Sequence, residues 1–395
     1  MMIIAVTIVL YFTGFVEKKE LNQLGIVAGM GIDKTESGYL VTTQIYNPEA
    51  IAGKNSNALP ILSLTAEGDT IYEALHRIDS KITKVLYFAH LDVIVVDEAL
   101  AEQGINFILD FSLRHKEIRP DVNILVAKDA RAHDVLNILT ATDPVPATQL
   151  DIFSNMVEKY TARLTDYNLY DVVNQMNAPG LNAVLNAVSI INETAEGKRL
   201  ATPEELEFGG SKDNLGTITV PIKLEINNLA VFNLDKLVGY MTSEDAQFYN
   251  FLREKDKRYF IKTKIDDEYF VTFETEQVKV KVEPNIPEKK VKIDCQVKGI
   301  LIEHGYPMDL STKNNIQITE YYLEKQLKED IFRFLEKTQQ ELKTDVLGIG
   351  RKVFYKDSKN WSMIQGYWNE LYTELDFDVD VDLHIKTVGE IQNIR

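Results

Sequence analysis

Cysteine is almost absent from this 395-residue sequence, which contains only Cys295. A single cysteine cannot form a disulfide within the chain, so the fold must be held by its apolar cores. Cys295 lies in the stretch VKIDCQVKG, where Val291, Ile293 and Val297 alternate with polar residues. This period of two predicts a strand whose apolar face carries the thiol. We therefore expect a buried, unreactive cysteine; a reactive thiol is the alternative and would need exposure and nearby cations.

Basic residues are scarce relative to acidic ones. The chain has 43 Lys and Arg against 60 Asp and Glu, which gives a net charge of −17. Nucleic acid requires a basic face, and anionic lipid repels an acidic body. The charge therefore argues against nucleic acid as a partner and against a body that lies flat on an anionic membrane.

Long apolar runs are missing except at the N-terminus, where residues 1–16 are almost wholly apolar. As a helix this leader would be roughly 24 Å long, short of the ~30 Å hydrocarbon core of a bilayer. Its length is typical of a secretory signal, with a buried core helix as the alternative. Phe12-Thr13-Gly14 resembles the end of a lipoprotein signal, but Phe15 occupies the position of the acylated cysteine. We expect no lipidation at Phe15: the leader stays as an anchor, is cut by another peptidase, or reflects a wrongly chosen start.

Motifs that carry catalysis or bind cofactors are missing as well. Gly29-x-Gly31 lacks the third glycine of a dinucleotide fingerprint, and no P-loop occurs. Gly209-Gly210-Ser211 lacks the second glycine of a nucleophile elbow, because Asp213 stands there. The six histidines are scattered, with no pair at metal-ligand spacing. We therefore expect no catalytic residues, no cofactor site and no metal site.

Four alternating aspartates near the C-terminus imitate the start of a calcium loop. The stretch DFDVDVDLHI carries Asp376, Asp378, Asp380 and Asp382, but Val381 stands where that loop needs glycine. The intervening apolar residues predict a strand with a solvated acidic face. A weak cation site is the alternative.

Apolar patterns in the first half predict a mixed α/β domain. Strands are expected at 24–33 and 39–46, joined by a turn at Ser37-Gly38. Strands and helices then alternate to residue 195, which predicts a parallel sheet with right-handed crossovers. After the leader, residues 17–195 are thus the N-terminal domain. Residues 196–262 begin with a polar boundary or surface loop and predict a small middle domain with a hairpin and a helix.

The last part of the chain, residues 263–395, predicts an α+β domain. Three alternating strands with charged outer faces predict an antiparallel sheet with one wet side. A long leucine-striped helix follows, and Gly348 and Gly350 are expected to end it. A second helix places Trp361 and Trp368 on one face, where we expect core residues, with an aromatic ligand platform as the alternative.

Several stretches along the chain resemble one known family. They are KKELNQLGIVAGMGID, YLVTTQIYNP, FAHLDVIVVDEALAEQGI, LDFSLRHKEIRPDVNILVA, NNLAVFNLDKLVGYM and KTDVLGIGRKVFYKDSKNW. Together and in this order they resemble the C subunits of spore germinant receptors, the Ger(x)C family. In that family the leader usually ends in Gly-Cys-Trp-Asp, whereas Gly14-Phe15-Val16-Glu17 stands here.

The resemblance implies a three-domain lipoprotein without catalysis on the outer face of the spore inner membrane. It implies two integral-membrane partner subunits, of A and B type, and a role in sensing nutrient germinants. The positions that match the family's motifs are Arg114, Arg119, Asp345, Gly348, Gly350 and Trp368. We expect the two glycines to permit a tight turn. We expect the two arginines to bridge carboxylates inside the domain; contact with a partner is the alternative.

The leading hypothesis is thus a non-enzymatic receptor subunit, tethered to the membrane by its N-terminal segment. The alternative is an exported small-molecule binding protein of a transport system, which would need two similar lobes and a hinge. An exported hydrolase is a third option, and it lacks a nucleophile constellation in this sequence.

Overall fold

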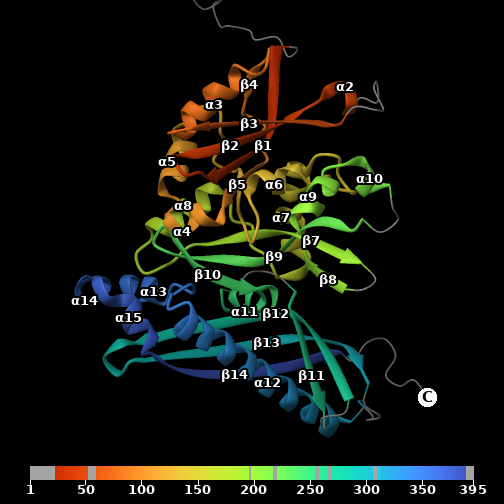
Figure 1. Cartoon of the computed structure of the whole chain (residues 1–395). Helices are drawn as coiled ribbons and strands as arrows, with labels where there is room; N and C mark the ends of the chain where they lie inside the picture. Colours follow the sequence, from red (N-terminus) through yellow and green to blue (C-terminus); the bar gives the residue numbers. More distant parts are fainter. Residues whose placement is uncertain are drawn as a thin grey trace, which may run out of the picture.

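The protein folds around two β-sheets, one above the other in Figure 1. The computed structural model describes residues 23–51, 59–194, 197–216, 220–253, 258–265, 269–305, 310 and 312–387. The apolar leader and Phe15 lie outside the described residues. Among the described helices, none combines the length and the apolar character needed to cross a membrane.

The first sheet has ten strands in the order β10-β9-β7-β6-β5-β1-β2-β3, with β4 paired to β1 and β8 paired to β7. Its parallel centre is β1 (Leu24–Lys34), β5 (Val93–Asp97), β6 (Asn123–Ala127) and β7 (Val184–Thr194). At one edge, β2 (Tyr39–Tyr46) and β3 (Ile61–Gly68) continue antiparallel from β1. The short β4 (Val85–Tyr87) runs parallel to the start of β1. The predicted hairpin and the predicted parallel crossovers are therefore confirmed.

Helices cover both faces of this sheet. Alternate residues of β5 belong to different cores: Ile94 and Val96 to one face, Val93 and Val95 to the other. Burial on both sides explains why this strand has a continuous apolar sequence. The first face carries α3 (Ile71–Asp79), α4 (Glu98–Gln103), α5 (Asn106–Arg114) and α8 (Leu169–Asn177). The second carries α6 (Ala132–Asn137), α7 (Pro146–Thr161) and α9 (Pro203–Gly209). A further short helix, α2, spans Pro48–Ile51.

The segment after residue 195 differs from the sequence prediction in two ways. The expected polar loop contains a strand, β8 (Gly197–Leu200), and the helices α9 and α10 (Lys212–Leu215), because β8 can pair with the end of β7. The strands β9 (Ile222–Asn233) and β10 (Lys236–Thr242) continue the first sheet, since β9 pairs with β7 along its length. A separately folding middle domain at 196–262 remains a prediction.

The second sheet has the order β11-β12-β13-β14. Its strands are β11 (Phe260–Ile265), β12 (Tyr269–Asn285), β13 (Lys290–His304) and β14 (Asp376–Thr387). The two strands predicted within β12 form one strand, with a bulge between Thr275 and Gln277. The last strand lies parallel to β13 rather than antiparallel, because the chain returns across the helices before β14 begins. Cys295 is buried on the inner face of β13, as predicted.

One long helix, α12 (Lys313–Glu336), packs on the inner face of the second sheet, with Leu323, Leu327 and Ile331 buried. A π-helical turn, Lys337–Glu341, follows it directly. The prediction that Gly348 and Gly350 end this helix is wrong: they begin the next one, α13 (Ile349–Lys356). The predicted second helix is divided into α14 (Ser358–Ile364), a 3₁₀ turn and α15 (Trp368–Thr373).

The two sheets share one continuous apolar core. Buried residues of β1 and β5, such as Met30 and Ile94, belong to the same cluster as Val291 and Leu323 of the second sheet and α12. Helix α11 (Ser243–Leu252) lies between the sheets and contacts β9, β10 and β12 (Figure 1). The mixed α/β sheet and the second, helix-packed sheet predicted from the sequence are confirmed.

Candidate functional site: a buried carboxylate where the two sheets meet

Asp345 is the centre of a buried, hydrogen-bonded polar site in the second half of the chain. Its side chain is fully buried, in the loop between the π turn and α13. The carboxylate accepts hydrogen bonds from the backbone N–H groups of Gly348 (2.8 Å), Ile349 (3.1 Å) and Gly350 (2.7 Å). It also accepts one from Nε1 of Trp368 at 3.1 Å. Four of the six family-motif positions therefore meet at one carboxylate.

The carboxylate occupies the N-terminus of α13. The first N–H groups of a helix have no partner within it, and the helix dipole favours a negative charge there. Gly348 is the residue before α13 and has no side chain that could cap the helix. Asp345 supplies the missing acceptor from three residues upstream. Burial raises the pKa of the Asp345 carboxyl, and the hydrogen bonds from Gly350 and Ile349 oppose this effect.

Glycine is required around this carboxylate for two different reasons. Gly348 has φ +72°, the left-handed conformation that glycine adopts without strain, so the predicted tight turn exists there. Gly350 leaves room for its neighbours: a Cβ would lie 2.7 Å from Nε1 of Trp368 and 2.9 Å from Cα of Gly180. Gly180, with φ +63°, belongs to the loop between α8 and β7. A Cβ at Gly180 would lie 2.3 Å from the backbone of Gly350.

Hydrogen bonds across this contact join the two halves of the chain. The N–H of Arg351 donates to the carbonyl of Gly180 at 2.9 Å. Asn182 donates to the carbonyl of Asp345 from its backbone N–H (3.2 Å) and from Nδ2 (3.3 Å). We call this set the junction: Gly180, Asn182, Asp345, Gly348, Gly350, Arg351 and Trp368. It fixes the loop that leads into β7 of the first sheet against the helices that precede β14.

Two further elements surround the junction. Arg253, at the end of α11, donates from Nη1 to the carbonyl of Val346 at 3.2 Å and lies over the ring of Tyr249. Trp361 and Trp368 meet edge to face, with ring centroids 5.4 Å apart, and are 5% and 4% exposed. The prediction that both tryptophans are core residues is therefore confirmed.

The two arginines of the family motifs lie elsewhere, on the surface of the first half. Arg114 donates to both oxygens of Asp110 one turn earlier in α5 (2.9 and 2.8 Å). Arg119 donates from Nε to Asp121 at 2.9 Å. Both arginines therefore bridge carboxylates of their own domain, as predicted, with side chains that are 78% and 59% exposed. Both ion pairs are local and solvated, and contact with a partner remains a prediction.

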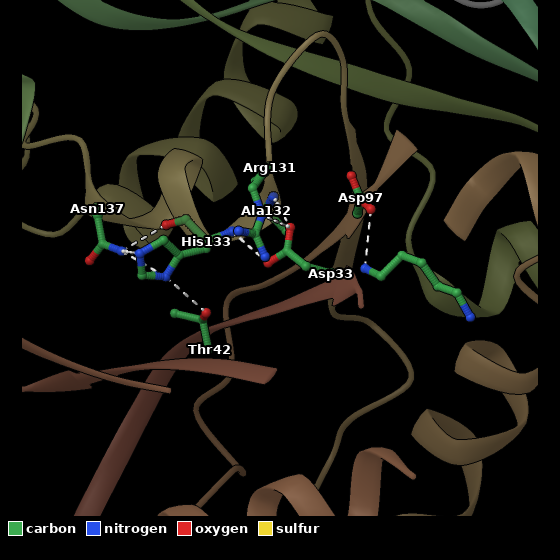
Figure 2. A network of polar contacts seen from close by, with 8 residues as sticks. Asp33, Thr42, Asp97, Arg131, Ala132, His133 and Asn137 are labelled. Carbon is green, nitrogen blue, oxygen red and sulfur yellow. Dashed lines mark hydrogen bonds and ion pairs between the residues drawn. The ribbon is translucent and has the colours of Figure 1, made fainter. Parts of the chain in front are cut away.

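A second buried carboxylate, which the sequence analysis missed, lies in the first sheet (Figure 2). Asp33, at the end of β1, is fully buried and accepts hydrogen bonds from the N–H groups of Ala132 (2.7 Å) and His133 (2.9 Å) at the start of α6. Arg131 approaches it at 3.8 Å. Burial raises the pKa of Asp33 to about 6. The signal in the sequence was an aspartate within an otherwise apolar strand.

The aspartates of β14 show no sign of a cation site. Asp376, Asp378, Asp380 and Asp382 are exposed, while the alternating Phe377, Val379 and Leu383 are buried, as predicted for a solvated face. In the register of the sheet, Asp378 lies opposite Lys292 of β13. Across the part of the chain that the structure describes, no group of three or more His, Cys, Asp or Glu side chains could hold a metal ion.

Comparison with known proteins identifies the class of protein. Residues 17–190 match the family model described as "Spore germination protein N-terminal domain". Residues 227–389 match the model described as "Spore germination B3/ GerAC like, C-terminal". The chain therefore belongs to this family of spore germination proteins, as its motifs indicated.

Individual relatives resemble it over nearly their whole length. The chain is 28% identical to "Spore germination protein KC" of Bacillus subtilis (strain 168), a match that covers 96% of this chain and 93% of that protein. It is 23% identical to "Spore germination protein B3" of the same strain (94% and 93%) and 22% identical to "Spore germination protein GerQC" of Bacillus cereus (96% and 96%). It shares its fold with the crystal structure of the GerBC protein, with a TM-score of 0.57, 20% identity, and coverage of 91% and 97%.

Proposed function

We propose that this chain is a C-type subunit of a germinant receptor and acts in spore germination without catalysing a reaction. The observation that carries the proposal is the match to both family models, in order and over 17–190 and 227–389. Every relative named above is a spore germination protein, and the matches cover more than nine-tenths of each. The family is not known as an enzyme family.

The junction supports a role in transmitting a conformational change. Asp345 accepts four hydrogen bonds from the protein itself, so its carboxylate positions backbone and does not face a substrate. The same residues fix the loop before β7 to the helices before β14. A displacement of one sheet is therefore passed to the other through buried, mutually dependent contacts, which packed interiors transmit well.

The alternative, a binding protein of a transport system, has less support. Such a protein needs two similar lobes around a hinge. Here the first sheet has ten strands with a parallel centre, whereas the second has four strands and one long helix across its inner face. The two halves are different folds joined by a continuous core.

Germination of spores tests the proposal directly. We expect spores without the gene to lose the response to at least one nutrient, and the wild-type gene to restore it. Complementation with Asp345→Ala should fail, while complementation with Asp376→Ala, an exposed aspartate outside the junction, should succeed. Normal germination of the deletion strain on every nutrient, in a strain without a second copy of the family, would contradict the proposal.

Location and partners require a separate experiment. We propose that the protein lies on the outer face of the spore inner membrane, held by its N-terminal segment and by two integral-membrane subunits. Crosslinking in intact spores followed by mass spectrometry should recover two multi-span membrane proteins with this chain. Recovery of the chain only in the soluble fraction, with no membrane protein attached, would overturn this part.

A further inference from the structure

A cavity of about 490 Å³ lies directly beside the junction. One wall comes from the first half of the chain: the end of α8 at Asn177, the following loop at Asn182, and the end of β9 at Asn233. The opposite wall comes from the segment 361–370, which includes the 3₁₀ turn between α14 and α15. Its volume lies in the range of small-molecule sites. Any ligand that fills the cavity touches both halves of the chain.

The lining of this cavity is rich in neutral amides and contains no cation among its described residues. Its polar side chains are Asn177, Asn182, Asn233, Gln365, Asn369 and Glu370. Some of these amide groups already bond within the protein: Nδ2 of Asn177 donates to the carbonyl of Val173, Asn182 bonds to Asp345 and Leu234, and Nδ2 of Asn369 donates to Oδ1 of Asn233. The amide groups that these bonds leave over include both donors and acceptors, which is the complement of a hydroxyl group. An anionic ligand would find no Lys, Arg or His to pair with, and it would meet the carboxylate of Glu370. The chemistry of the walls therefore selects neutral ligands with many hydroxyl groups.

One aromatic ring is available to the same ligand. Tyr367 lines the cavity and is 48% exposed, and beside it Gly366 leaves open space around its Cα. A half-exposed ring offers an apolar face together with a hydroxyl group. The C–H groups of a ring-shaped polyol can pack on that face while its hydroxyl groups bond to the amides. Trp361 and Trp368 form the buried floor.

We propose that this cavity binds a small neutral polyhydroxy compound, such as a sugar or a cyclitol. Because the two walls belong to different halves of the chain, the bound compound favours the arrangement in which the junction is closed. In that arrangement the N–H of Arg351 bonds to Gly180, and Asn182 bonds to Asp345. Ligand binding thereby shifts the population of junction states. The signalling consequence rests on the proposed function, whereas the binding itself does not.

Calorimetry on the purified full chain tests the site. The probes are myo-inositol, sorbitol and galactose, and gluconate serves as the carboxylate counterpart of sorbitol. We expect at least one neutral probe to bind with a Kd of about 1 mM or tighter, and gluconate to bind at least tenfold more weakly than sorbitol, a difference of about 1.4 kcal/mol. No heat with any neutral probe, or equal affinity for sorbitol and gluconate, would overturn the proposal.

Variants with matched controls locate the binding. Asn177→Ala and Tyr367→Ala should each weaken binding by about fivefold or more, because one hydrogen bond is worth about 1 kcal/mol. Asn174→Ala, an exposed asparagine on the same helix, and Tyr321→Ala, a 61% exposed tyrosine on α12, should bind like wild type. All four positions are exposed or half-exposed, so the variants are expected to fold, which thermal unfolding verifies. Binding that is unchanged in both cavity variants would refute the site.

The two proposals fail in different experiments. Polyol binding by the purified chain, combined with normal germination of the deletion strain, would leave the cavity assigned and refute the receptor role. Absence of binding, combined with a germination defect, would refute the cavity and leave the receptor role in place.

Discussion

Asp345 and Asp33 each accept hydrogen bonds from the N–H groups at the start of a helix, in different parts of the chain. The residues before α13 and α6, Gly348 and Arg131, make no side-chain cap to their helices. In each case a fully buried aspartate from outside the helix accepts the first N–H groups instead. Buried carboxylates are stable only when they are hydrogen-bonded in this way. At the residue scale, both aspartates are positioning groups.

Gly350 should tolerate no side chain, whereas a nearby glycine should. In Gly350→Ala the new Cβ lies within 3 Å of Trp368 and Gly180, so we expect a loss of about 1–3 kcal/mol in the free energy of unfolding. In Gly366→Ala the Cβ meets no atom within 4 Å, and we expect a change within about 0.5 kcal/mol. Urea unfolding followed by tryptophan fluorescence measures both. Equal free energies of unfolding for the two variants would contradict a contribution of this close contact to stability.

Asp33 should make stability depend on pH between about 4 and about 6. Its pKa is raised by burial from 3.8 to about 6, so in this range the folded state binds more protons than the unfolded state. The free energy of unfolding therefore falls as pH rises through this range, by about 3 kcal/mol in total. Asp33→Asn replaces the titrating carboxyl with a neutral amide. The free energy of unfolding of this variant should therefore not fall by this amount between about pH 4 and about pH 6.

Unfolding measured at several pH values, with wild type and the variant compared at each, isolates this effect. Asp69→Asn, at an exposed position before α3, is the matched control and should follow the wild-type profile. A difference between wild type and Asp33→Asn that stays constant from pH 4 to pH 7 would contradict the assignment.

At the scale of elements, the alternating patterns predicted most strands and the broad character of each half. The joining of two predicted strands into the single strand β12, and the parallel direction of β14, did not follow from those patterns. β14 lies at an edge, with four exposed aspartates along it. Its outer backbone is partly covered by α12: the N–H groups of Leu383 and Ile385 donate to Glu324 and Glu320, each at 2.9 Å. These glutamates and the aspartates together protect the edge from pairing with another strand.

Removing the two glutamates should loosen this edge. In the double variant Glu320→Ala/Glu324→Ala we expect a loss of about 2 kcal/mol, since two backbone donors lose their acceptors. Glu320→Gln/Glu324→Gln keeps an oxygen at each position and should retain most of the stability. Hydrogen exchange at the amides of Leu383 and Ile385 reports on the edge itself. Equal exchange rates in the alanine double variant and wild type would show that the glutamates do not hold the strand.

At the scale of the whole molecule, the two halves are joined rather than independent. A single apolar cluster extends from the first sheet through α11 to α12 and the second sheet. The junction adds hydrogen bonds between the loop before β7 and the start of α13. A receptor subunit that passes a change from one end to the other needs such continuity.

The described part of the chain should therefore unfold cooperatively. We expect one transition by calorimetry for the wild-type protein. Gly180→Ala places a Cβ 2.3 Å from the backbone of Gly350 at a φ of +63°, so it should lower the melting temperature and separate the transition into two. Gly366→Ala should keep the single transition. Two transitions already present in the wild type would contradict the joined core.

Local periodicity in the sequence determined the strands, the long helix, the buried Cys295 and the solvated face of β14, because alternation and helical spacing depend only on neighbouring residues. The motif stretches also determined the family. Only the tertiary structure showed that β9 and β10 complete the first sheet, that β14 is parallel, and that Asp345 and α13 meet the loop of Gly180 and Asn182. Such contacts join residues as far apart as Gly180 and Arg351, 171 positions along the chain, and their geometry depends on how whole elements pack, which no local pattern encodes.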